Sequence, residues 1–491
     1  MTTTLDRPGF NNTAPARGHR KVTTRSARRR RWPRAWPLAA LLLGYPLWWA
    51  TGMGEIVWTL FAIPMCVQMY RRRPIRLPPM FWLWGLFLTL VVVSSVMLNV
   101  HAADTIATNS GGGNYVAYAV RLLNYVSVTI VMIYIGNLTE QELPRLRLIR
   151  WLGVVFVVTV LGGLAGTAMP SFGYDSPIKR FVPSSLQGID FVQQFTHIGT
   201  AQVQQGLGFP RPSAPFEYAN AWGNNYSMLL IWFVIGWFLL ASTRRRIAAL
   251  GIVLASVVPV VYSQNRGVWL GLGLGVVYVA LRLALLRRFG VLLGMAAVLV
   301  VSGVLVVATP LQAVVNNRLS ATHNSNDLRG SLSQQALSVA AGSPLIGYGS
   351  TRSTIGSNKS LAIGKSPGCP KCGNRVIGST GQLWLILVAQ GYVGALLYLL
   401  FLFQGVVRYW RDNSVVGIGG TLVLLLSIFY TLLYTAVVSP LAITLIGMAL
   451  LWRNDDARRE QGAAERDKRI AQRERWARTA RSRRMPSART S

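Results

Sequence analysis

Long apolar runs alternate with short basic segments along most of the chain. Each run holds roughly twenty residues, the length that an α-helix needs to cross the hydrocarbon core of a bilayer. The runs are continuous, so they indicate helices and not the alternating strands of a transmembrane barrel. The pattern predicts an all-α, polytopic helical membrane protein with about twelve transmembrane helices. We place these helices at residues 36–51, 54–70, 79–99, 115–136, 151–169, 223–241, 247–262, 267–285, 289–308, 382–406, 415–433 and 436–452.

The same pattern divides the chain into three parts. Residues 1–35 form a basic tail that we expect to be disordered and cytoplasmic. Residues 36–452 form the membrane domain, and residues 453–491 form a second charged cytoplasmic tail. Two long polar segments, 170–222 and 309–381, are predicted to be extracytoplasmic loops. Loops of this length are usually functional or disordered, so we expect the chemistry to take place outside.

Composition supports a membrane protein, since 52% of the residues are hydrophobic and only 13% are charged. The formal net charge is +34, and much of it lies in the tails and in short loops such as 71–73 and 244–246. These loops fall on one side of the predicted bundle, which by the positive-inside rule is cytoplasmic and places both termini there. No nucleic-acid-binding motif accompanies the charge. We therefore predict contact with anionic membrane lipids and no nucleic-acid partner.

A short polar island, Ser263-Gln264-Asn265-Arg266-Gly267, separates two apolar runs at the predicted outer face. An arginine at the end of a membrane span is costly unless it faces water, a partner or a ligand. One interpretation is a snorkelling arginine in a tight turn. We favour a functional arginine, because few short loops on this side carry a cation.

A second polar stretch precedes the predicted helix at 223–241. Three prolines make the approach extended, and polar residues then continue into the helix. Capping of that helix and an interfacial aromatic belt would explain part of this pattern. Capping alone does not explain so many amides at the start of a membrane span. The polar residues that can face one outer cavity are Arg211, Glu217, Asn220, Asn224 and Asn225.

The predicted loop at 309–381 is strongly basic, with seven cations against the single acid Asp327, and 7 − 1 gives +6. Such a surface suits an anionic ligand such as a phosphate or diphosphate, although attraction to lipid headgroups would also explain it. Residues 331–341 are predicted to form a short amphipathic helix. The seven cations are Arg318, Arg329, Arg352, Lys359, Lys365, Lys371 and Arg375.

Cys369 and Cys372 lie in the same loop. A zinc site would need about four ligands, and only His323 is an obvious third. A redox motif would need a thioredoxin-like fold, which the pattern does not support. We interpret the pair as a tight structural disulfide outside the membrane. No motif for a nucleotide, metal or other cofactor is present, so none is expected.

Three stretches, in this order and on one predicted face, resemble the O-antigen ligase and O-antigen polymerase superfamily of bacterial membrane glycosyltransferases. The first is the Asn-rich start of a central helix, and the second is similar to the pattern Ser-x-x-Arg-Gly-x-x-Leu. The third is the basic loop with its Gly-rich flanks. The resemblance covers residues 211–402. The stretches are 211–225, 263–270, Arg329 with 344–349, 381–384 and 391–394.

The resemblance implies a donor glycan linked through diphosphate to a polyprenyl lipid. The glycan is transferred to a glycan acceptor at the outer face of the bacterial plasma membrane, and the lipid diphosphate leaves. Arg211 and Arg266 would hold the diphosphate and stabilise its growing charge, with Arg329 as a weaker third. We add Asn220, Asn224, Asn225, Asn265 and Trp222 as substrate-binding candidates.

One position departs from the resemblance. Many members carry a His-Asn pair just before the helix that follows the large loop, where this chain has Thr380-Gly381. Either Glu217 deprotonates the acceptor hydroxyl, or leaving-group stabilisation and positioning suffice. The departure favours a polymerase of lipid-linked repeat units over a ligase.

Two rival functions stay open. A flippase or transporter of lipid-linked glycan would carry polar residues near the bilayer midplane, in broken helices of two similar halves. Here the polar residues collect at the predicted outer ends of the spans. A purely structural membrane protein would not require a basic outer cavity.

Overall fold

The computed structural model describes residues 33–105, 113–187, 190–202, 209–320, 323–354, 375–436 and 438–484. These residues are mostly helical, as predicted, with little sheet. Six helices are long and apolar enough to cross a membrane, and three shorter apolar helices accompany them. The chain is therefore a membrane protein, while the count of about twelve spans stays a prediction.

The elements follow in chain order. The helices are α1 (Trp36–Leu43), α2 (Tyr45–Ala50), α3 (Ile56–Tyr70), α4 (Phe81–Val93), α5 (Gly113–Asn137), α6 (Arg145–Ala168), α7 (Ser184–Gln187), α8 (Asp190–Thr196), α9 (Ala219–Phe233), α10 (Thr243–Tyr262), α11 (Arg266–Leu285), α12 (Phe289–Val307), α13 (Leu311–Ser320), α14 (His323–Gly342), α15 (Gln382–Tyr409), α16 (Val415–Thr431) and α17 (Val438–Arg484). The irregular helical turns are η1 (Ser94–Met97), η2 (Pro177–Phe181) and η3 (Val234–Leu239). The strands are β1 (Gly173–Asp175), β2 (His197–Gly199), β3 (Ala201–Gln202), β4 (Arg211–Pro212), β5 (Arg352–Ser353) and β6 (Val376–Ile377), which form the antiparallel pairs β1–β2, β3–β4 and β5–β6.

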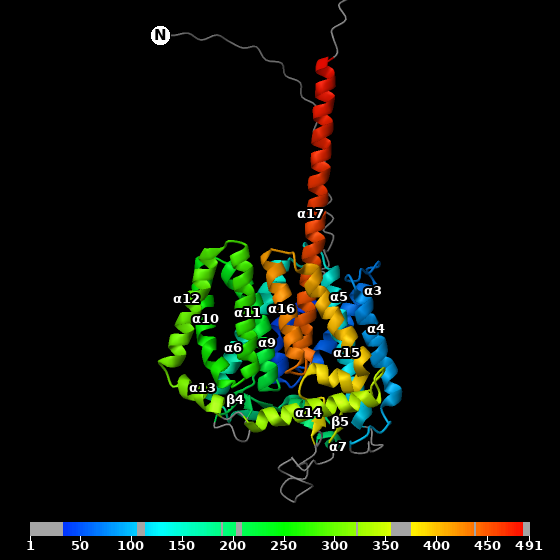
Figure 1. Cartoon of the computed structure of the whole chain (residues 1–491), viewed down its shortest axis with the longest axis vertical. Helices are drawn as coiled ribbons and strands as arrows, with labels where there is room; N and C mark the ends of the chain where they lie inside the picture. The colour runs from blue at the N-terminus through cyan, green and yellow to red at the C-terminus, as the bar shows by residue number, and fades with distance from the viewer. Residues whose placement is uncertain are drawn as a thin grey trace, which may run out of the picture.

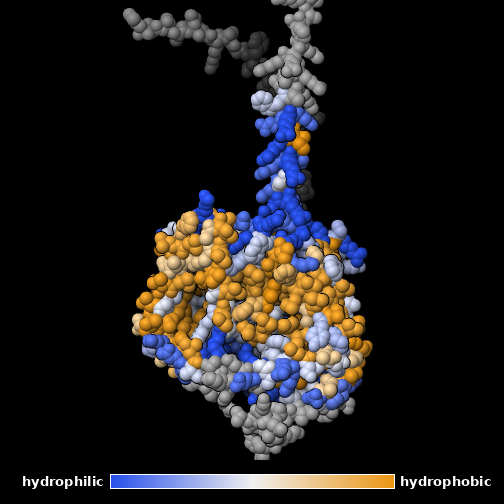
Figure 2. Space-filling model, viewed as in Figure 1, coloured by the Kyte–Doolittle hydropathy of each residue, from blue (hydrophilic) through white to orange (hydrophobic). Residues whose placement is uncertain are grey.

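The long helices run side by side in one bundle with two different ends (Figure 1). The charged half of α17 projects from one end, which we call the α17 face. Helix α14 lies across the other end, together with α13 and the short strands; we call this the α14 face. A broad apolar band surrounds the bundle between the two faces (Figure 2). Such a band is what a bilayer requires of the surface that it covers.

The first half of α17 forms much of the core. Its apolar residues include Leu445, Ile446 and Leu450, which are fully buried. The helix packs against α5, α9 and α16. Gly136 in α5 permits close contact, because a Cβ there would lie 2.0 Å from the ring of Trp452. The apolar half therefore anchors α17 in the bundle and leaves its charged half outside.

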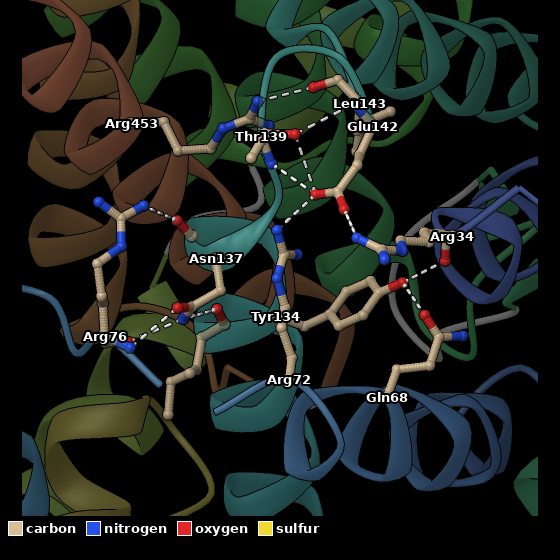
Figure 3. Close-up of polar contacts among 12 residues, drawn as sticks. Arg34, Gln68, Arg72, Arg76, Tyr134, Asn137, Thr139, Glu142, Leu143 and Arg453 are labelled. Atoms are coloured by element: carbon tan, nitrogen blue, oxygen red, sulfur yellow. Dashed lines mark hydrogen bonds and ion pairs between the residues drawn. The ribbon is translucent and has the colours of Figure 1, made fainter. Parts of the chain in front are cut away.

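Ion pairs hold the α17 face together (Figure 3). Glu142, in the turn between α5 and α6, accepts hydrogen bonds from Arg34 and, over 2.8 Å, from Arg72. Burial alone would raise the pKa of this carboxyl, but these bonds and one from a backbone N–H lower it to about 2. Arg453 of α17 donates to the Leu143 carbonyl oxygen over 2.7 Å. The contacts tie the α5–α6 turn to α17 and to the chain that leads into α1.

The predicted long loops are largely folded on the α14 face. Residues 170–222 hold the strands β1–β4, and the predicted helix at 331–341 extends from His323 to Gly342. Helix α14 packs on α15 through a stripe at helical spacing. This stripe consists of the buried side chains Leu332, Ala336, Val339 and Ala340.

Helix α15 is broken at Gly391, whose φ is +68°. The turn that follows α14 enters the break. The Tyr348 N–H donates to the Val388 carbonyl oxygen over 2.9 Å, and the Tyr392 N–H donates to the Pro344 carbonyl oxygen over 2.8 Å. The break therefore fixes the turn after α14 against α15.

Candidate functional site

A cavity of about 800 Å³ opens at the α14 face between α5, β4, the start of α9, α14 and the start of α15. Figure 2 shows hydrophilic residues along the edge of the apolar band at the α14 face. The volume falls within the usual range for small-molecule sites. The polar and charged residues that line the cavity include Glu55, Arg121, Asn124, Arg211, Asn220, Arg329, Arg375, Thr380, Gln382 and Tyr434.

Arg211 is the most constrained of the predicted site residues. It lies in β4, which pairs with β3 just before α9, and its side chain is buried. Its Nε donates to the Ser263 carbonyl oxygen over 2.6 Å, and its Nη2 donates to Asn220 Oδ1 over 2.9 Å. The guanidinium is thus held by oxygens from two other elements, with its orientation set before any ligand arrives.

The polar island forms the turn between α10 and α11. Gln264 takes the left-handed conformation with φ +50°, and its carbonyl oxygen faces α13. Asn265 donates from Nδ2 to Asn220 Oδ1 over 3.3 Å and accepts a hydrogen bond from the Tyr434 hydroxyl. Gly267 allows this packing, because a Cβ there would lie 2.2 Å from the Tyr434 hydroxyl oxygen. The island is therefore a buried polar connection between α9, α11 and the turn before α17.

Three further arginines approach this connection from α11, α13 and α14. Arg266 is the first residue of α11. Arg318 donates from Nε to the Gln264 carbonyl oxygen over 2.9 Å. Arg329 donates from Nη1 to the Leu433 carbonyl oxygen over 3.3 Å.

The four arginines are close enough to influence one another. Burial lowers the pKa of Arg211 to about 10; Tyr434 opposes the shift, and the cations of Arg318 and Arg329 add to it. Burial also lowers the pKa of Arg318, and the cations of Arg266 and Arg329 contribute. Several cations gathered in a partly dry site bind a multiply charged anion strongly.

The structure separates the remaining candidates. Asn220 lines the cavity, whereas Asn224 and Asn225 are buried in the core. Asn225 donates from Nδ2 to Ser439 Oγ over 2.9 Å. Trp222 is fully buried and donates from Nε1 to the Thr159 carbonyl oxygen over 3.0 Å. Among the described residues, Arg266 does not line the cavity, and its charge acts on Arg318.

Glu217 lines a second, smaller cavity of about 40 Å³ beside the large one. Glu55, at the end of the α2–α3 connection, lines both cavities. Burial raises the pKa of Glu217 to about 7. Burial and then the charge of Glu217 raise the pKa of Glu55 well above its usual range.

Sequence reasoning missed several cavity residues, including Glu55 and Arg121. Each leaves a signal in the sequence: Glu55 is a single acid between two apolar runs, and Arg121 is a single cation inside the run at 115–136. Gln382 was also missed. It donates from Nε2 to the Tyr125 hydroxyl over 2.8 Å and accepts from the Ala436 N–H over 2.9 Å. Glu55 and Arg121 could have been found from the sequence, because an ionisable residue within a membrane segment is a functional-site candidate by default.

Two further predictions concern a disulfide and a metal site. Cys369 and Cys372 fall outside the described residues, so their disulfide stays a prediction. Among the residues that the structure describes, no three His, Cys, Asp or Glu side chains are grouped as metal ligands would be.

The O-antigen ligase family model matches residues 250–368. The match includes the polar island and the arginines of α11, α13 and α14, while Arg211 and Glu55 lie outside it. The resemblance to the O-antigen ligase and polymerase superfamily is confirmed over this region. No curated protein and no solved structure matches the chain.

Proposed function

Because residues 250–368 match the O-antigen ligase family, we propose that this chain transfers a glycan from a polyprenyl diphosphate carrier to a hydroxyl group of an acceptor. Transfer takes place on the α14 face, which we propose lies outside the plasma membrane. The family match supports ligase-type transfer to an acceptor more than it supports polymerisation.

The observation that carries this proposal is a group of four interacting arginines, of which Arg211 and Arg329 line the cavity. In glycan transfer, the bond between the sugar and the diphosphate breaks, and negative charge grows on the leaving diphosphate. Preorganised cations stabilise such a charge in the transition state. Arg211 is held in place by Ser263 and Asn220, so little reorganisation is needed.

The wall formed by α5 supports a donor with a lipid tail. Val116, Ala117 and Val120 line the cavity, and the apolar side chain of Val116 is 51% exposed. This helix is one of the six candidate spans. A diphosphate in the cavity can therefore remain attached to a polyprenyl chain that lies in the surrounding bilayer.

A polymerase is the second candidate, since it uses the same donor with another lipid-linked glycan as acceptor. It is favoured by the Thr380-Gly381 sequence, which replaces the His-Asn pair of many superfamily members. Thr380 lines the cavity, so this departure lies at the proposed site.

The test is glycan analysis in cells that carry Arg211→Ala. We expect glycan transfer to fall about 100-fold or more, because a positioned cation is lost from the transition state. Arg245→Ala is the matched control, since Arg245 is exposed at the other end of α10. Membrane levels of both variants are measured in parallel.

The product that accumulates separates the alternatives. Intact long glycan on the polyprenyl carrier supports a ligase, whereas single repeat units support a polymerase. Normal glycan with normal protein levels would contradict the proposed function.

A further inference from the structure

The connection between α2 and α3 brings an unassigned carboxyl group to the cavity. Glu55 immediately precedes α3 and is only 9% exposed. The connection is covered by the segment before α9: the Tyr174 hydroxyl donates to the Ala50 carbonyl oxygen over 2.7 Å. Close packing at Gly52, where a Cβ would lie 2.3 Å from the Phe195 carbonyl oxygen, fixes the connection further.

Glu55 is chemically distinct within the cavity wall. Among the described residues that line the large cavity, it is the one carboxyl group, and there is no histidine. The other ionisable groups of the wall are arginines and tyrosines. Guanidinium groups stay protonated and cannot accept a proton, and neutral phenols are weak bases. An acceptor hydroxyl in this cavity therefore meets one side chain suited to taking its proton.

Glu217 stands behind Glu55. The two residues share the smaller cavity, to which the large one is joined through Glu55. A Cβ on Gly54 would lie 3.8 Å from Glu217 Oε1, which places this carboxyl beside the α2–α3 connection. Like charges on two neighbouring buried carboxyl groups oppose each other, so the charge of Glu217 adds to burial in raising the pKa of Glu55.

We propose that Glu55 accepts the proton of the acceptor hydroxyl and that Glu217 is a positioning residue whose negative charge makes Glu55 a stronger base. The inference rests on the proposed function. The acceptor oxygen forms a bond to the anomeric carbon of the donor as its proton moves to the Glu55 carboxylate. The bond from that carbon to the diphosphate oxygen breaks, and its electron pair leaves with the lipid diphosphate. The proton is then released from Glu55 to the outer solution.

A base formed by Glu55 beside Glu217 implies that turnover depends on pH. A base works only when it is deprotonated, so turnover falls as the pH falls through the range where Glu55 takes up a proton. Because burial and the charge of Glu217 raise the pKa of Glu55 well above its usual range, we expect this acidic limb well above the usual range of a carboxyl group. Other titratable groups facing the pair are Tyr45 from α2, His197 from β2, and Arg211 and Tyr218 beside α9.

The experiment uses the full chain in phospholipid vesicles with polyprenyl-diphosphate-linked oligosaccharide extracted from cells. Release of polyprenyl diphosphate is measured from about pH 5 to pH 9. We expect Glu55→Gln to lower turnover about 100-fold or more while donor binding is retained, and Glu55→Asp to keep part of the activity. Glu217→Gln removes the negative charge beside Glu55, so the acidic limb of this variant lies at lower pH than that of the unsubstituted chain.

Three outcomes decide the inference. Glu55→Gln with more than half of the normal turnover would overturn it, as would an unchanged pH profile in Glu217→Gln. If Glu55→Gln does not fold, the Glu217→Gln profile alone decides. Arg211→Ala distinguishes failure of this inference from failure of the proposed function. If Arg211→Ala is inactive while Glu55→Gln is active, only this inference fails. If both variants are active, the proposed function fails too.

Discussion

At the start of α9, Asn220, Asn224 and Asn225 follow one another closely in the sequence, yet their side chains reach different surroundings. Asn220 accepts hydrogen bonds from Arg211 and Asn265 and lines the cavity. Asn224 and Asn225 are buried in the core of the bundle, where Asn225 Nδ2 donates to Ser439 Oγ. Residue type alone does not separate these roles, because helical rotation decides which side faces the cavity.

This difference predicts that substitution of Asn220 lowers mainly turnover, whereas substitution of Asn225 lowers mainly stability. Asn220→Ala should lower turnover about tenfold or more, because Arg211 loses an oxygen that orients it, and leave thermal stability nearly unchanged. Asn225→Ala should lower the free energy of unfolding by about 1–3 kcal/mol, because the buried Ser439 hydroxyl loses its donor. Turnover per folded molecule and the unfolding temperature in detergent are measured for both. Similar effects of the two substitutions on both quantities would contradict the assignment.

At the scale of elements, the break in α15 joins the α14 face to the bundle. The turn after α14 inserts between Ala389 and Tyr392, and backbone hydrogen bonds seal it in place. Only glycine adopts the φ of +68° at residue 391 without strain. The sequence supplied the Gly391–Gly394 motif, but its role in holding α14 depends on a contact between distant segments.

Gly391→Ala should therefore destabilise the protein strongly. The backbone at φ +68° and ψ −170° alone costs about 1–3 kcal/mol for alanine, and the new Cβ would lie 2.5 Å from the Pro344 carbonyl oxygen. Thermal unfolding in detergent measures the effect. Gly273→Ala in α11 is the control, since open space surrounds that position; an equal effect at both positions would show that the break is not required.

The whole molecule has two unlike ends, and charge distinguishes them. Ion pairs and the basic half of α17 gather at the α17 face, whereas the arginines and the cavity lie at the α14 face. By the positive-inside rule, we propose that the α17 face is cytoplasmic and that the cavity is outside. A leaving lipid diphosphate would then be released in the outer leaflet.

Labelling of single cysteines tests this orientation. In a chain whose native cysteines are replaced, we introduce Leu345→Cys on the α14 face and Glu465→Cys on α17. Both positions are exposed. A membrane-impermeant thiol reagent should label only Leu345→Cys in intact cells and both positions after permeabilisation. The reverse pattern would place the cavity in the cytoplasm and remove the proposed site of transfer.

The sequence by itself determined the helical membrane class, the positions of most helices and the superfamily resemblance. Apolar length and local motifs are properties of continuous segments, so they can be read without knowing what lies beside them. It also offered Arg266 as a candidate, because a cation at the edge of an apolar run is unusual wherever it packs, and it offered Arg211 and Arg329 through the resemblance.

Only the tertiary structure decided which of these residues meet. Arg211 contacts Ser263, and Glu55 shares a cavity with Glu217, although each pair is far apart in the sequence. It turned two predicted loops into folded elements and placed Trp222 and Asn225 in the core. The physical reason is that a site depends on distances and burial, which arise from packing between segments, whereas the sequence records only the chemistry that each segment brings.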